Sequence, residues 1–175
     1  DGAELGRAFG QGLRLIVALT LPAGALLFVL GAPILEVLFV WGRFDAGDAA
    51  ATLPVLQVFA VGLLFYGVSG LFTRCFHASK DTRTPVRVAG WTFAVNTVLS
   101  LALMWPFGTP GLAAANVLAA GFQAVWLGCL LSRDHPRLRF ADYWGGLVKP
   151  VVATVVMAVA AWALHLGCGL VWEGK

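Results

Sequence analysis

The stretch that decides the fold is LRLIVALTLPAGALLFVLGAPILEVLFV, residues 13–40, whose only charged side chains are Arg14 and Glu36. A helix needs about 20 mainly apolar residues to cross the hydrocarbon core of a bilayer. This run is longer than that, so it predicts a transmembrane helix. Pro22 and Pro33 lie inside it, and each removes a backbone hydrogen bond, so we expect the helix to kink or tilt.

Four more apolar runs follow, each ending at charged residues or at a turn sequence. They cover residues 49–73, 86–106, 111–132 and 147–170. The chain of 175 residues is 59% hydrophobic and 12% charged, whereas about 25% of residues are charged in a typical soluble domain. The sequence therefore predicts an all-α, polytopic transmembrane helix bundle with five spans.

Lysine and arginine are distributed unequally between the two sides that five spans would create. Successive loops alternate sides, which places only Arg43 and Lys175 on one side. The other side receives ten of the twelve cations: Arg7, Arg14, Arg74, Lys80, Arg83, Arg87, Arg133, Arg137, Arg139 and Lys149. Because loops rich in Lys and Arg stay in the cytoplasm, we predict that this second side is cytoplasmic.

The loop RCFHASKDTRTPVR, residues 74–87, connects the second and third spans and holds four of these cations. Topology alone could explain them, since each cation near an anionic leaflet contributes about 1 kcal/mol. Alternatively the cluster attracts an anionic group, because the planar fork of Arg donates paired hydrogen bonds to phosphate. We call this segment the basic hairpin.

Short polar residues mark the starts of two spans. Thr84 precedes Pro85, an order that predicts a capping hydroxyl ahead of a proline in the first helical turn. Asp45 and Asp48 precede the second span, where acidic groups favour the positive end of the helix dipole. We expect all of these residues to shape helix ends.

A few polar residues inside the spans are candidates for function. An ionisable side chain within or beside the bilayer is expensive, which makes Glu36 a candidate, although a place near the outer interface would let it reach water. Asn96 and Asn116 fall near mid-span on consecutive helices. They could line a polar cavity or simply hydrogen-bond between helices.

No enzyme active site is predicted. GVSG, residues 67–70, and His165 suggest the serine and histidine of a rhomboid protease, but Ser69 lies near one end of its span and His165 about 27 Å away towards the other. Nucleophile and base must be in hydrogen-bond contact, so this pair is excluded. Gly67 and Gly70, like the small residues of 111–121, are instead expected to allow close helix packing.

The composition also argues against metals, cofactors and nucleic acid. Cys75, Cys129 and Cys168 form no CxxC pair, so no metal site and no disulfide framework is expected. The net charge is +3, yet no stretch interleaves basic and aromatic residues as a nucleic-acid surface would. We predict no cofactor, no metal and no nucleic-acid partner.

Three stretches together resemble the later half of the MurJ (MviN) family, the lipid II flippases of bacterial peptidoglycan synthesis. They are LPAGALLFVLGAPILEVLFVWGRFDAGDAAAT at 21–52, RCFHASKDTRTPVRVAG at 74–90 and GTPGLAAANVLAA at 108–120. The G-x-F-D-A-x-D turn and the aromatic-x-A-x-x-D-T-x-T-P-V hairpin occur in family order at family-like spacing. The resemblance covers approximately residues 5–135.

The resemblance implies part of a two-lobed MOP-type transporter in the bacterial cytoplasmic membrane. Residues 1–135 would form four spans of the second lobe, and residues 136–175 a basic cytoplasmic loop and an additional transmembrane helix. The chain begins on Asp, so we expect a fragment that lacks the N-terminal helices of the same protein. In this family, the arginines that bind lipid II lie mostly in those helices.

The resemblance further implies that the complete protein moves lipid II, a lipid-linked sugar pyrophosphate, from the inner to the outer leaflet by alternating access. Such a transporter supports cell-wall synthesis and cell shape, and it contacts membrane lipids. Two alternatives stay open: export of another polyprenyl-linked glycan or a drug, and a non-transporting membrane scaffold. As a substrate pathway or gate we expect Arg74, Lys80, Asp81, Arg83, Arg87, Glu36, Asn96 and Asn116.

Overall fold

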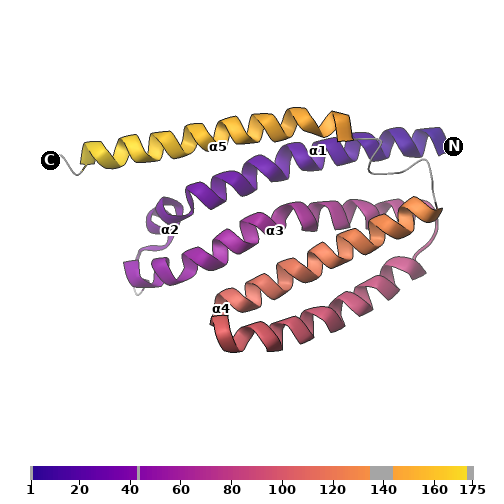
Figure 1. Cartoon of the computed structure of the whole chain (residues 1–175), viewed down its shortest axis with the longest axis horizontal. Coiled ribbons are helices and arrows are strands. Elements are labelled where there is room, and N and C mark those ends of the chain that lie inside the picture. The colour runs from indigo at the N-terminus through magenta and orange to yellow at the C-terminus, as the bar shows by residue number, and fades with distance from the viewer. Residues whose placement is uncertain (1, 43, 135–143, 173–175) are drawn as a thin grey trace.

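The computed structural model describes residues 2–42, 44–134 and 144–172, and these residues form helices joined by short turns (Figure 1). The elements are α1 (Gly2–Val29), α2 (Gly31–Phe39), α3 (Ala46–Ala78), α4 (Arg83–Asp134) and α5 (Trp144–Trp172). Helices alone satisfy every backbone polar group within one segment, as the interior of a bilayer demands. The predicted all-α class is confirmed.

Four of these helices are long and apolar enough to cross a membrane, and one of them, α4, crosses twice. Gly108 in its middle has φ 58° and ψ −135°, which is not helical and which only glycine adopts easily. The two arms of α4 run antiparallel on either side of this bend (Figure 1). The predicted spans 86–106 and 111–132 are these two arms, so the expectation of five crossings is confirmed.

The prediction of a single kinked span over residues 13–40 is wrong in its limits. The helix begins at Gly2, breaks at Leu30 and resumes as the nine-residue α2. Pro33 explains the position of the break, because it has no N–H to donate to the carbonyl four residues earlier. Pro22 lies inside α1 without interrupting it.

A side chain from α3 compensates part of this break. The Gln57 amide donates to the Phe28 carbonyl oxygen over 3.4 Å, close to the point where α1 ends. Backbone carbonyls released inside a membrane need such a partner. Gln57 therefore ties α3 to the α1–α2 junction.

The start of α3 is capped as the sequence predicts. The Asp48 N–H donates to Asp45 Oδ1 over 2.9 Å, and the Asp45 N–H donates to Asp48 Oδ2 over 3.2 Å. This reciprocal pair satisfies two backbone donors that the first helical turn leaves free. The predicted role of both acids at this helix end is confirmed.

The turns and helix ends gather at two ends of the molecule (Figure 1). The start of α1, the α3–α4 turn and the start of α5 lie at one end, which we call the inner end. The bend at Gly108, the end of α2 and the end of α5 lie at the other, the outer end. This alternation is what the predicted cytoplasmic basic side requires, and Arg137 and Arg139 of that prediction lie outside the described residues.

The largest fully buried side chains of the described residues belong to one hydrophobic cluster at the inner end. Phe9 of α1 stacks on Phe72 of α3 with ring centroids 6.0 Å apart. Around this pair lies a cluster contributed by every long helix: Leu13, Val17, Leu71, Cys75, Phe76, Val88, Leu127, Leu131 and Leu147. Dispersion contacts of this density hold helices together where lipid offers no hydrophobic driving force.

Small residues let the helices approach closely, but one of the predicted glycines has no neighbouring helix beside it. A Cβ at Gly67 would lie 2.7 Å from Ile16 Cγ2, so α1 and α3 touch there. Nothing lies within 4 Å of a Cβ at Gly70, so the prediction for that glycine is wrong. The small-residue face of 111–121 is confirmed, with alanines 113, 115, 119 and 120 buried.

Candidate functional site

The basic hairpin begins with a tightly defined end of α3. The Lys80 N–H donates to the His77 carbonyl over 3.0 Å, and the Asp81 N–H donates to the Phe76 carbonyl over 2.9 Å. This bond pattern is a Schellman motif, in which the residue after the cap adopts the left-handed conformation. Here that residue is Lys80, with φ 61°, at a position where glycine is usual.

The start of α4 is capped by Asp81 and not by Thr84. Asp81 Oδ1 accepts from the Arg83 N–H over 3.0 Å and from the Thr84 N–H over 3.1 Å. Thr84 lies one residue inside the helix, which begins at Arg83, so the prediction that its hydroxyl caps the helix is wrong. The Schellman turn places Asp81, two residues before the helix, where its carboxylate reaches both N–H groups.

The electrostatics of the turn favour an ionised Asp81. The hydrogen bond from the Thr84 side chain lowers the pKa of this carboxyl, and the backbone bonds from Thr84 and Arg83 and the charge of Arg87 act in the same direction. Each of these donors stabilises the carboxylate more than the neutral acid. The hairpin thus keeps one fixed anion among its cations at neutral pH.

This shift gives a testable dependence of stability on pH. A depressed folded-state pKa stabilises the fold above the unfolded pKa of about 3.9, and the contribution is lost as pH falls through the folded value. We expect Asp81→Asn to lower the thermal midpoint at pH 7 and to flatten its acid decline. Thermal unfolding in detergent between pH 7 and pH 3 measures both. An unchanged acid decline would contradict the capping role.

The four cations of the hairpin are exposed, but their backbone rests on the core. Arg74, Lys80, Arg83 and Arg87 lie at the surface. Beneath them Cys75, Phe76, Pro85 and Val88 are buried. A rigid base spares the cost of ordering the backbone when an anion binds, so only the freedom of the Arg and Lys side chains is lost. The arrangement suits the electrostatic capture of phosphate or carboxylate at the inner end.

Glu36 is not part of this cluster. It is exposed on α2 at the outer end, beside the exposed side chains of Val37 and Leu38 (Figure 1). The hairpin lies at the inner end, so the 33 residues of α3 separate the two. A helix of this length spans about 50 Å, so Glu36 and the hairpin cannot act on the same group at once.

The two asparagines each have a polar partner within the spans. The Tyr66 hydroxyl donates to Asn116 Oδ1 over 3.2 Å, which joins α3 to α4. The Ser100 hydroxyl donates to Asn96 Oδ1 over 3.3 Å within the first arm of α4. The interhelical bond of Tyr66 is the kind of packing contact that a polar residue within a span predicts, whereas Ser100 was not among the predicted residues. The spacing of four residues between Asn96 and Ser100 is a signal that could have found the second pair.

The bond between Tyr66 and Asn116 is open to a small, specific test. Tyr66→Phe removes one interhelical hydrogen bond and leaves the ring in place. We expect a loss of about 0.6 kcal/mol, the average for such bonds between transmembrane helices. A double-mutant cycle with Asn116→Ala, followed by thermal unfolding in detergent, measures it. Strict additivity of the two changes would show that the bond contributes nothing.

Ser69 shows no arrangement for catalysis. Its hydroxyl donates to the Tyr66 carbonyl over 3.1 Å within the same helix, and the residue is buried. The side chain of His165, its excluded partner, lies outside the described residues. Among the residues that the structure describes, no group of His, Cys, Asp and Glu could hold a metal ion.

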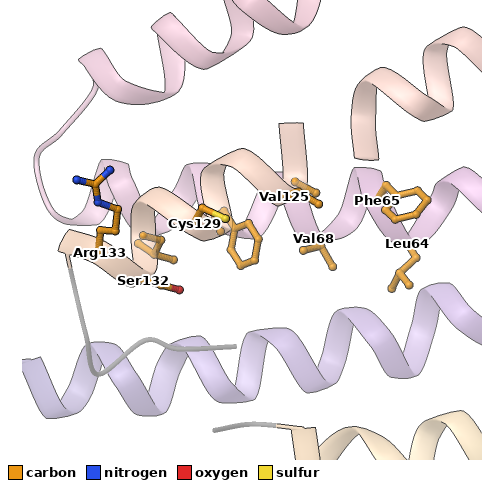
Figure 2. Close-up of a pocket in the computed structure, with 11 residues that line it drawn as sticks. Leu64, Phe65, Val68, Val125, Cys129, Ser132 and Arg133 are labelled. Atoms are coloured by element: carbon orange, nitrogen blue, oxygen red, sulfur yellow. The ribbon is translucent and has the colours of Figure 1, made fainter. Parts of the chain in front are cut away.

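An apolar groove, which the sequence did not predict, lies between α3 and the second arm of α4 (Figure 2). Its volume is about 650 Å³. The walls include Leu64, Val68 and Phe72 from α3 and Val125, Cys129 and Arg133 from α4. Figure 2 shows Leu64 and Phe65 at one end of the groove and Ser132 and Arg133 at the other.

Comparison with known proteins gives one consistent family. The sequence profile of the family described as "Lipid II flippase MurJ" matches residues 1–168. The protein named "Probable lipid II flippase MurJ" from Bdellovibrio bacteriovorus is 33% identical over 145 residues, which are 83% of this chain and 28% of that protein. Its namesake from Synechocystis sp. is 32% identical over 162 residues, 93% of this chain and 30% of that protein.

A solved structure has the same fold. The chain described as "Lipid II flippase MurJ, inward closed conformation" superposes with a TM-score of 0.73 at 19% sequence identity. The match covers 100% of this chain and 41% of the other. The chain thus spans less than a third of the length of the two curated relatives above.

Proposed function

Because the chain belongs to the lipid II flippase MurJ family, we propose that the protein moves lipid II from the inner to the outer leaflet of the bacterial cytoplasmic membrane. The observation that carries this proposal is the family match over residues 1–168. Alternating access, the rocking of two lobes about a cavity, is the mechanism we infer. It needs no covalent step, so the protein acts as a transporter and not as an enzyme.

Within this proposal, residues 1–135 supply four spans of the second lobe, and residues 136–175 a basic loop and one additional helix. The curated relatives are about three times as long as this chain. Their remaining helices would complete the cavity and provide the other lobe. Lipid II and the surrounding bilayer lipids are the partners that this arrangement implies.

We assign the basic hairpin to the inner gate. A lipid-linked pyrophosphate starts its passage at the cytoplasmic leaflet with its negative charge at the level of the headgroups. The four exposed cations of the hairpin lie at the inner end, and the buried side of the turn holds them in place. Charge-assisted hydrogen bonds to phosphate are stronger than neutral ones. The hairpin can therefore attract the headgroup or close the entrance behind it.

The hairpin assignment predicts a functional defect without a folding defect. We expect the triple variant Arg74→Gln, Lys80→Gln and Arg83→Gln to lower flipping at least about ten-fold, since each lost charge-assisted bond costs about 1.5 kcal/mol or more. The test introduces the variant into the complete natural protein. Complementation of bacteria depleted of their own lipid II flippase gives the readout. Full activity with normal membrane insertion would leave the hairpin a topological anchor only.

Lys80 offers a matched control for this test. Lys80→Gly removes one charge while it relieves the left-handed backbone, which costs about 1–2 kcal/mol for a residue with a Cβ. We expect thermal stability to rise and flipping to fall in the same variant. If flipping is unchanged, the charge of Lys80 has no part in the gate.

A further inference from the structure

The groove between α3 and the second arm of α4 is lined by apolar or small residues except at its inner end, where Ser132 and Arg133 lie. Asn116 and Gln123 are seven residues apart and so share one face of this arm. Val125 is nine residues from Asn116, which places it about 180° around the helix, and its side chain is 66% exposed. Polar residues of membrane helices face the protein interior or a cavity, so we infer from this pattern that the groove side is turned towards lipid.

The groove is about as long, measured along the helices, as the hydrocarbon of one leaflet is thick. Its walls run from Leu64 to Phe72 on α3 and from Ala124 to Arg133 on α4. At a rise of about 1.5 Å per residue these segments are about 12 Å and 14 Å long. Half of a hydrocarbon core about 30 Å thick is about 15 Å. An acyl chain confined to one leaflet therefore matches the length of this groove.

The charge at the groove's mouth matches a lipid headgroup. Arg133 and Ser132 lie at the end nearest the end of α4, which is the inner end (Figures 1 and 2). The remaining walls are apolar or small, with Leu64, Val68 and Val125 along the groove. A guanidinium above an apolar channel suits a phosphate whose chain lies in that channel.

We propose that this groove binds one acyl chain of an anionic phospholipid of the inner leaflet, with Arg133 holding the phosphate. The volume of about 650 Å³ lies within the range of about 300–1,000 Å³ that ligand sites in proteins occupy. The ligand is a resident bilayer lipid and not the transported lipid. The proposal therefore stands whether or not the protein flips lipid II.

The test uses the complete natural protein in lipid vesicles that contain photoreactive phosphatidylglycerol or phosphatidylcholine, each with a diazirine on one acyl chain. Mass spectrometry should find adducts within residues 64–72 and 124–133. Phosphatidylglycerol should label about five-fold more than phosphatidylcholine, the ratio that one cation near an anionic headgroup supplies. Arg133→Gln should abolish that preference, whereas Arg7→Gln, at the same end of the molecule, should keep it.

A second pair of variants tests the groove itself. Val125→Trp fills the channel and should lower labelling several-fold. Val98→Trp, on the first arm of α4 and equally 66% exposed, should leave it unchanged. Both side chains are exposed in the part of the protein that the structure describes, so neither change displaces a buried neighbour there. Absence of groove adducts, whether because another helix covers it or because no lipid binds, would overturn the proposal, as would equal labelling of the Val125→Trp variant and the unmodified protein.

Discussion

Gly111→Ala should destabilise the protein by about 3 kcal/mol, the upper part of the range for overpacked sites. A Cβ at this position would collide with the backbone carbonyl of Leu103 across the bend of α4, and it would lie 3.0 Å from Phe107 Cβ. Backbone atoms cannot rotate away as the end of a flexible side chain can. The two arms would have to separate just after the turn at Gly108.

The same helix supplies the control for this prediction. Gly90→Ala adds the same methyl group to α4, but nothing lies within 4 Å of its Cβ. Alanine is favoured over glycine in a helix by about 1 kcal/mol, so this variant should be neutral or slightly stabilising. Thermal unfolding of both variants in detergent gives the comparison. Equal midpoints for the two would mean that the arms of α4 do not close as described.

The spans could be predicted because their signals are local. Apolar length, proline and turn residues located the two arms of α4 and the capping acids Asp45 and Asp48 without any knowledge of packing. The motif GVSG contains two glycines three residues apart, yet only Gly67 meets α1. Which side of a helix finds a neighbour is a property of the whole bundle, and a single sequence does not contain it.

The candidate site also has features that the local sequence predicts and features that depend on packing. The hairpin residues from Arg74 to Arg87 lie together because the chain turns there, so their proximity was predictable. That Asp81 and not Thr84 caps α4 could not be predicted, because it depends on how the Schellman turn ends α3. The groove joins residues about 60 positions apart, and its detection required the packing of α3 against α4.

The core beneath the hairpin is the second place where a single change should have a large effect. Phe76 is 1% exposed and belongs to the buried cluster around Phe9 and Phe72. Its carbonyl oxygen accepts the hydrogen bond from the Asp81 N–H that closes the turn after α3. Truncating a buried Phe to Ala costs about 3–5 kcal/mol in soluble proteins. For Phe76→Ala we expect a loss near the lower end of this range. Lipid is as apolar as this core, so most of the lost free energy comes from the cavity.

Phe93 makes the comparison sharp. It lies on the first arm of α4 with 73% of its surface exposed, so Phe93→Ala leaves no cavity and should change stability little. Denaturation in mixed detergent should separate the two variants by about 3 kcal/mol. Because Phe76 supports the backbone of the basic hairpin, its loss should also loosen the turn and expose the amide of Asp81 to hydrogen exchange. If exchange at Asp81 stays as slow in Phe76→Ala as in the unmodified protein, the hairpin holds its shape without the core, and its rigidity comes from the capping bonds alone.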